Sequence, residues 1–274
     1  MTAHDRAALA SATRVVVKVG SSSISGEAAW RIPVIVEALA AAHARGAEVL
    51  LVSSGAIATG MPYLQLDARP NDLATQQAAA AVGQNVLVYR YQEALRPFEI
   101  VAGQVLLTAS DMEDPTHRSN ARRAIERLLG LRILPIINEN DTVATHEIRF
   151  GDNDRLAALV ARLVGADALV LLSDIVALYT RPPDEPGAEP IDVIAADDDL
   201  SGYAFGSKVV NSVGTGGAAT KASAARLASS AGIGVLVTSA DRVADALAGA
   251  PIGTWFVPSD ERPPATGAVA TLGG

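Results

Sequence analysis

Short apolar runs alternate with longer amphipathic or alanine-rich segments along most of the chain. Six runs are rich in β-branched and aliphatic residues, and they cover 14–20, 47–55, 99–108, 132–138, 167–174 and 233–240. Five segments between them have the spacing and end signals of helices, and they cover 28–46, 72–98, 118–131, 153–166 and 220–232. Because strand and helix patterns alternate, we predict an α/β fold whose largely parallel sheet is covered by helices on both faces.

One domain over residues 1–257 and a C-terminal tail over 258–274 are the expected organisation. No internal repeat is evident, and the last 17 residues, "PSDERPPATGAVATLGG", combine prolines, charges and small residues without apolar periodicity. Hydrophobic residues make up 49% of the chain and aromatic residues only 4%, so alanine, valine and leucine must supply the core. That balance is typical of helices packed on a parallel sheet.

Charge and composition exclude several classes of function. The net charge of −8 and the pI of about 5.0 argue against sequence-independent binding of nucleic acid. The absence of cysteine rules out disulfides and thiolate metal sites. No apolar run approaches the roughly 20 residues that span a bilayer, and no hydrophobic segment of signal-peptide length opens the chain. We therefore expect a cytoplasmic protein that binds neither membrane nor nucleic acid.

Small, polar or charged residues follow four of the predicted strands. They form "GSSS" at 20–23, "SSGA" at 53–56, "NEND" at 138–141, and the pair Ser173 and Asp174. Turn formation alone explains any one of these loops. In open parallel sheets, however, ligands bind at the carboxyl ends of the strands, so four such loops predict a common site.

Lys18 lies inside the first predicted strand, between "VVV" and "VG". Burying its ammonium without a partner would be costly. Two interpretations stay open at this point. The side chain could reach solvent from an edge strand, or its ammonium could emerge at the strand end and bind a phosphate.

A glycine-rich loop, "VGTGGAATK" at 213–221, precedes a predicted helix. Its glycines let backbone N–H groups approach an anion at the helix N-terminus. The loop lacks the GK[ST] of a Walker A motif; it matches the loose dinucleotide pattern through Gly214, Gly216 and Ala219, but it comes late in the chain. Lys221, in the first helical turn, opposes the helix macrodipole unless a bound phosphate offsets it. We favour a nucleotide phosphate over a dinucleotide.

The segment at 137–159, "INENDTVATHEIRFGDNDRLAAL", places acids and amides directly after an apolar strand. Asp141, Asp152 and Asp154 could ligate Mg²⁺, but Mg²⁺ in phosphoryl-transfer sites is usually held partly by substrate phosphates. The EF-hand spacing fails, and the four histidines are too scattered for a zinc site. Amides both donate and accept hydrogen bonds, so the mixture fits a zwitterion such as an amino acid.

Together these motifs resemble those of the amino acid kinase family. The matching pieces follow the family's order over about 14–257, and they are "VVVKVGSSS", "LVSSGAIATG", "DLATQQAAAAVGQ", "GQVLLTASDMED", "NENDTVATHEIRFGDNDRLAALVA", "LLSDIVALYT" and "VGTGGAATKASAA". "SSGAI" and "NENDTVA…FGDND" are specific to the branch that phosphorylates glutamate. The resemblance implies a three-layer αβα sandwich. It also implies transfer of a phosphoryl group from ATP, with Mg²⁺, to the γ-carboxylate of L-glutamate, which is the first step of proline biosynthesis.

The resemblance also implies roles for individual residues. The catalytic set, in which Asp154 orients two lysines, comprises Lys18, Asp154 and Lys221. The glutamate-binding set comprises Ser54, Asn138, Asp141, Asp152 and Asn153. The nucleotide-binding set comprises Lys18, Gly20, Ser173, Asp174, Thr215, Gly216, Gly217, Ala218, Ala219, Thr220 and Lys221. No residue is assigned to a metal site of the protein itself.

The resemblance further implies a homo-oligomer, a dimer or tetramer, and proline as a feedback inhibitor. Three positions depart from the family pattern: Ala177 replaces the usual glycine, Ala218 the usual methionine, and Gln76 a common lysine. Many members carry a C-terminal PUA domain, and this chain ends too early to contain one, so we expect a form without it. Two rival functions stay open, namely a kinase of this fold with another small acceptor and a non-catalytic sensor of glutamate or proline.

Overall fold

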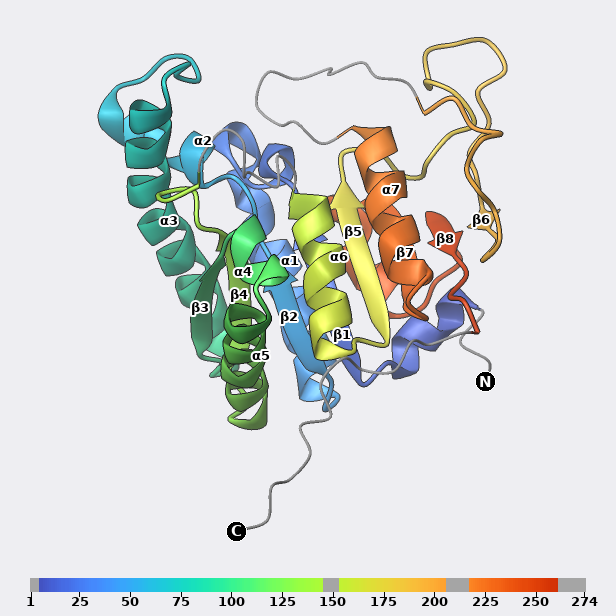
Figure 1. Ribbon diagram of the computed structural model, residues 1–274, viewed down its shortest axis with the longest axis horizontal. Helices are drawn as coiled ribbons and strands as arrows, with labels where there is room; N and C mark the ends of the chain where they lie inside the picture. The colour runs from blue at the N-terminus through green and yellow to red at the C-terminus, as the bar shows by residue number, and fades with distance from the viewer. Residues whose placement is uncertain (1–4, 145–152, 206–216, 261–274) are drawn as a thin grey trace.

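One eight-stranded sheet forms the centre of the computed structural model, which describes residues 5–144, 153–205 and 217–260 (Figure 1). The strand order in these ranges is β3-β4-β2-β1-β5-β7-β8-β6. The strands are β1 (Arg14–Val19), β2 (Glu48–Val52), β3 (Ala102–Leu107), β4 (Leu134–Glu139), β5 (Ala168–Ser173), β6 (Val193–Ile194), β7 (Gly234–Ser239) and β8 (Thr254–Phe256). All neighbours pair in parallel except β7 and β8. The predicted largely parallel sheet is confirmed.

Helices cover both faces of the sheet, as the apolar pattern predicts (Figure 1). One face carries α1 (Arg31–Ala44), α2 (Ala56–Gly60), α3 (Leu73–Leu95) and α8 (Val243–Leu247). The other carries α4 (Ala109–Glu113), α5 (Pro115–Gly130), α6 (Asn153–Val164) and α7 (Ala218–Ser229). Short 3-10 helices are η1 (Arg6–Ser11), η2 (Ser21–Ser23), η3 (Gly26–Trp30), η4 (Met61–Leu64), η5 (Arg96–Phe98) and η6 (Ala240–Arg242). Within the described ranges, no helix is both long and apolar enough to cross a bilayer.

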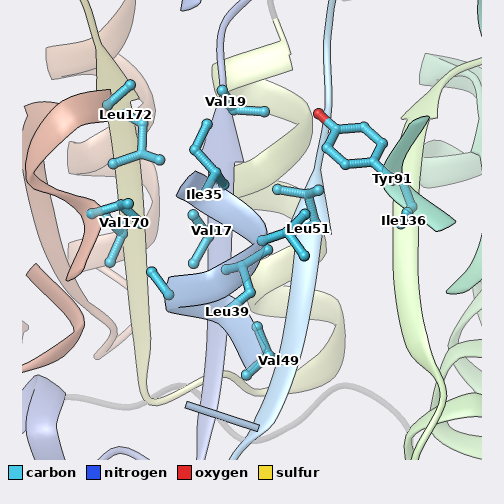
Figure 2. Close-up of a cluster of buried hydrophobic side chains, with 14 of the residues drawn as sticks. Val17, Val19, Ile35, Leu39, Val49, Leu51, Tyr91, Ile136, Val170 and Leu172 are labelled. Atoms are coloured by element: carbon cyan, nitrogen blue, oxygen red, sulfur yellow. The ribbon is translucent and has the colours of Figure 1, made fainter. Parts of the chain in front are cut away.

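Two hydrophobic cores lie on the two faces of the sheet because successive strand residues point to opposite sides. In β1, Val17 and Val19 belong to the core under α1, whereas Val16 belongs to the core under α6 and α7. Figure 2 shows the first of these cores, with Ile35 and Leu39 of α1 packed over the sheet. Strands that are buried on both faces need apolar residues at every position, which explains their continuous apolar runs.

The six predicted strands and five predicted helices are confirmed, with ends displaced by a few residues. The sequence pattern did not reveal β6 and β8, because two or three residues are too few to show a period. In β8, Trp255 packs against Gly234, where an added Cβ would lie 2.4 Å from the indole ring. The predicted tail begins at residue 258, yet the Ser259 N–H still donates to the Ser229 carbonyl at 2.8 Å.

Candidate active site

The loops that follow neighbouring strands contact one another at the carboxyl ends of those strands. The Ser53 N–H, after β2, donates to the carbonyl of Ile137 in β4 at 2.8 Å. Gly55 has a φ of 86°, and a Cβ there would lie 2.8 Å from Oγ of Ser25, which belongs to the loop after β1. Only a residue without a side chain fits this close approach. The structure thus brings together three of the four predicted loops, those after β1, β2 and β4.

A pair of glycines holds α2 against α3 immediately beyond these strand ends. A Cβ on Gly83 of α3 would lie 1.8 Å from the Ala56 carbonyl oxygen, and one on Gly60 would lie 1.9 Å from the Ala79 carbonyl oxygen. The two helices therefore touch backbone to backbone, which glycine alone permits. This contact fixes the start of α2, and with it the loop that contains Ser54, against α3.

Lys18 lies in the middle of the sheet. It is opposite Val52 of β2 on one side and Leu171 of β5 on the other. The edge-strand interpretation is therefore wrong, because β1 has a neighbour on each side. Lys18 is 2% exposed, and its ammonium forms an ion pair with Oδ1 of Asp154. An added Cβ on Gly20 would lie 3.9 Å from this ammonium, so the loop after β1 runs past it.

Asp154 joins Lys18 to Lys221 through its two carboxylate oxygens. Lys221 Nζ donates to Asp154 Oδ2 at 2.9 Å, and Asp154 is completely buried. The three side chains come from β1, α6 and α7, so residues that are distant in the sequence meet at one point. Two ammonium groups and one carboxylate leave one net positive charge at the carboxyl end of β1, which suits an anionic ligand.

The charge state of Asp154 follows from its surroundings. Burial by itself raises the pKa of the Asp154 carboxyl, but the ammonium groups of Lys18 and Lys221 outweigh burial and hold that pKa well below its ordinary value. Asp154 lies in the first turn of α6, where a negative charge is favourable. Lys221 lies in the first turn of α7, where a positive charge is unfavourable. The sequence predicts that a bound phosphate offsets this unfavourable charge; in the structure the Asp154 carboxylate already offsets part of it.

A network of side-chain amides lies beside this triad. Asn153 Nδ2 donates to the Ser53 carbonyl at 2.6 Å and to Asn138 Oδ1 at 2.7 Å. Asn138 Nδ2 in turn donates to Gln84 Oε1 at 2.6 Å. Asn138 is 1% exposed and Asn153 is 8% exposed, so Asn138 is the more deeply buried of the two amides. Gln84 is not among the residues predicted from the sequence, although an amide among Ala80, Leu87 and the other inward positions of α3 is a signal that points to it.

Two of the remaining candidates for the acceptor site, Ser54 and Asp141, belong to the strand-end loops that contain members of this network. Ser54 is half-buried directly after the residue whose carbonyl Asn153 contacts. Asp141 is half-buried in the turn that follows β4. Asp152, which is also predicted to bind glutamate, lies outside the described residues.

On the nucleotide side, the first turn of α7 is the main described feature. Gly217 is its N-cap residue, and among the described residues no side chain caps the helix, so its first N–H groups suit an anion. Thr220 Oγ1 donates to the Gly217 carbonyl at 2.8 Å. At the end of β5, Ser173 Oγ donates to Oδ1 of the exposed Asp174 at 3.0 Å. Thr215 and Gly216 lie outside the described residues.

Comparison with known proteins identifies the family. The sequence model described as "Amino acid kinase family" matches residues 13–239. The chain belongs to the amino acid kinase family. Proteins named glutamate 5-kinase are 70% identical in Clavibacter sepedonicus, over 94% of this chain and 99% of that protein, and 67% identical in Leifsonia xyli subsp. xyli, over 95% and 97%. The structure of carbamate kinase from Giardia lamblia bound to AMP-PNP has a TM-score of 0.66 at 17% identity and covers 91% of this chain and 100% of that one.

The predicted αβα sandwich of the amino acid kinase family is thereby confirmed. The three departures from the family pattern have different settings in the structure. Gln76 is buried and donates to the Pro70 carbonyl at 2.8 Å, so it ties the start of α3 to the loop before it. Ala177 is buried after β5, and Ala218 is half-buried as the first residue of α7.

Proposed function

We propose that this chain transfers the γ-phosphoryl group of ATP to the γ-carboxylate of L-glutamate, forming γ-glutamyl phosphate and ADP, the first step of proline biosynthesis. The observation that supports it best is the buried Lys18–Asp154–Lys221 triad, with its net positive charge, directly beside the amide network. Two of the similar relatives, at 70% and 67% identity, are named glutamate 5-kinase, and their names support glutamate as the acceptor.

The chemistry requires charge stabilisation more than proton transfer. A γ-carboxylate is already ionised near neutral pH, so it needs no general base. One of its oxygens forms a bond to the γ-phosphorus while the bond from that phosphorus to the bridging oxygen breaks and ADP leaves. Lys18 and Lys221 stabilise the negative charge shared between the two anionic reactants. Asp154 holds both ammonium groups in place before the substrates bind, so little reorganisation is needed during the transfer.

The amide network and the nearby carboxylates form the proposed glutamate site. Asp141 and Asp152 bind the ammonium of glutamate, and Ser54 and Asn153 contact its polar groups. Both N–H groups of the Asn153 amide already donate within the protein, so Asn153 offers glutamate its carbonyl oxygen. Asn138 acts on glutamate indirectly, through Asn153.

The proposed nucleotide site lies over the first turn of α7. Backbone N–H groups at Thr215–Lys221 bind the phosphates, and Gly20, Ser173 and Asp174 line the rest. In the part of the chain that the structure describes, no three acidic or histidine side chains gather closely enough to hold a metal ion. We expect the Mg²⁺ ion to arrive with ATP and to be held mainly by the phosphate oxygens of the nucleotide, as is usual in phosphoryl-transfer sites. When bound, the ion neutralises part of the phosphate charge.

Release of ADP in the presence of single amino acids tests the proposal. We expect turnover with ATP and L-glutamate, and none above background with aspartate, glutamine or carbamate. Turnover with another acceptor alone would establish a different kinase of this fold, and binding of glutamate without turnover would establish a sensor. A preparation carrying Lys18→Met, purified in parallel, measures any contaminating kinase.

Replacing Asp141 tests the acceptor half of the site. Asp141→Asn is expected to raise the glutamate KM by about 10- to 100-fold, because the partner of the substrate ammonium loses its charge. The ATP KM should change less than threefold. Asp174→Asn makes the same change in the proposed nucleotide site, so it should raise the ATP KM and leave the glutamate KM nearly unchanged. An unchanged glutamate KM in Asp141→Asn would remove this residue from the acceptor site.

Three further properties are proposed from the sequence. A homo-oligomer is testable by light scattering, and a cytoplasmic location by fractionation of cells. Feedback inhibition by proline is testable in the same ADP assay, by titrating proline at a glutamate concentration near its KM.

A further inference from the structure

Three polar side chains form a stripe along one face of α3. Gln77, Gln84 and Tyr91 are seven residues apart, and seven residues are close to two helical turns, so all three share a face. Each contacts a different segment around the proposed acceptor site. Gln77 Nε2 donates to the Ala144 carbonyl at 3.3 Å, beyond Asp141, and the Tyr91 hydroxyl hydrogen-bonds Ser53 Oγ at 3.0 Å. In Figure 2, Tyr91 lies between Leu51 of β2 and Ile136 of β4.

Gln84, the middle residue of this stripe, contacts the Asn138 amide, whose orientation decides which group of Asn153 faces a ligand. Asn138 Oδ1 accepts from Asn153 Nδ2 at 2.7 Å and from the Glu139 N–H at 2.9 Å. Asn138 Nδ2 donates to Gln84 Oε1 at 2.6 Å. If the Asn138 amide were turned over, its NH₂ group would face two other donors, and its oxygen would face the oxygen of Gln84. The Gln84 carbonyl and the Glu139 N–H therefore fix the same orientation from two sides.

The orientation of Asn138 determines what Asn153 can offer a ligand. With Asn138 Oδ1 turned toward it, Asn153 donates one N–H to that oxygen and the other to the Ser53 carbonyl at 2.6 Å. Its own carbonyl oxygen is the part of the amide left to accept a hydrogen bond. An acceptor at this point suits the ammonium of an amino acid and disfavours a second carboxylate.

We propose that Gln84 is a positioning residue for the phosphoryl acceptor. It acts through Asn138 to present the carbonyl oxygen of Asn153 to the substrate. The inference rests on the proposed function for the identity of that substrate, but the chain of hydrogen bonds holds for any acceptor that carries an ammonium group.

A double-mutant cycle on the glutamate KM tests this role. Gln84→Met keeps a side chain of similar length but removes the acceptor for Asn138 Nδ2. We expect the glutamate KM to rise about tenfold and the ATP KM to stay within twofold. In an Asn138→Ala background, Gln84→Met should change the glutamate KM less than twofold, because the group through which Gln84 acts is gone.

Gln92→Met on the same helix is the matched control. Gln92 accepts from the Ala102 N–H at 2.9 Å and donates to the Ile100 carbonyl at 3.2 Å, so its loss also removes side-chain hydrogen bonds from α3, but at the start of β3. It should lower the thermal stability and leave the glutamate KM unchanged. If Gln84→Met does not fold, Gln84→Asn, whose shorter side chain withdraws the acceptor, replaces it in the cycle.

Three results would overturn the proposal: an unchanged glutamate KM in Gln84→Met, an equal rise in the KM values of glutamate and ATP, or effects of Gln84→Met and Asn138→Ala that simply add. The unaltered chain separates this inference from the proposed function. If it turns over another amino acid but not glutamate, the proposed function is wrong. The same cycle, run on the KM of that other acceptor, then decides the role of Gln84.

Discussion

Asp154→Asn is expected to lower kcat about 10³-fold and the free energy of unfolding by about 3–5 kcal/mol. The substitution keeps the size of the side chain but leaves the ammonium groups of Lys18 and Lys221 buried without the carboxylate that they share. Both lysines then lose the geometry in which they stabilise the transferred phosphoryl group. Steady-state kinetics and urea unfolding of the same preparation measure the two effects.

Asp167→Asn is the control that separates stability from catalysis. Asp167 accepts hydrogen bonds from the Thr13 N–H and the Arg14 N–H, each at 2.9 Å, at the opposite end of β1. Its replacement should lower the free energy of unfolding and leave kcat unchanged. A kcat in Asp154→Asn within tenfold of the unaltered chain would contradict the proposed role of the triad.

The stabilising effect of Asp154 should also depend on pH in a defined direction. Its pKa is lowered in the folded state, so its contribution is fully present above the ordinary carboxyl pKa of about 4 and is lost as the pH falls through the folded-state value. The difference in unfolding free energy between the unaltered chain and Asp154→Asn should therefore be constant from pH 6 to about 5 and shrink below about pH 4. A difference that grows on acidification would contradict the low pKa.

The sequence predicts the fold well because the fold has strong local signals, whereas the grouping of Asp154 with the two lysines follows from the resemblance to the amino acid kinase family. Each strand is an apolar run because it is buried on both faces. Lys18 and Lys221 are conspicuous because each is a charge in an unfavourable local setting, within an apolar strand and in a first helical turn. The position of β1 within the sheet could not be predicted, since strand order depends on long-range crossovers. That is why the edge-strand interpretation of Lys18 stayed open until the structure excluded it.

The amide network was harder to predict for a different reason. Ser53 contributes its backbone carbonyl, a group that every residue has, so its side chain gives no hint of this contact. Gln84 and Tyr91 lie on the inward face of α3, 47 to 69 residues before Asn138 and Asn153 in the sequence. Residues that contact a ligand directly are therefore easier to predict from the sequence than residues that only position those ligand-binding side chains.

Lys18→Met is expected to lower kcat about 10³-fold while destabilising the fold less than Asp154→Asn does. Loss of the Lys18 ammonium removes a charge that stabilises the transferred phosphoryl group, but the Asp154 carboxylate keeps its bond from Lys221. Methionine also fills the apolar space of the lysine side chain between β2 and β5. The asymmetry arises because Asp154 bridges two lysines, so removing one lysine leaves an ion pair and removing Asp154 leaves two cations.

Arg226→Met is the control for loss of a cation near the same elements. Arg226, on α7, donates to the carbonyl oxygens of Ala195 and Ala196 at 3.1 and 2.7 Å, and it should affect stability but not kcat. Kinetics and urea unfolding of Lys18→Met, Asp154→Asn and the double variant complete the comparison. If Asp154 acts mainly by holding the lysines, the double variant should lose little more kcat than either single variant. Losses of kcat that multiply would mean that Lys18 and Asp154 act independently, and the triad would then have to be divided into separate catalytic groups.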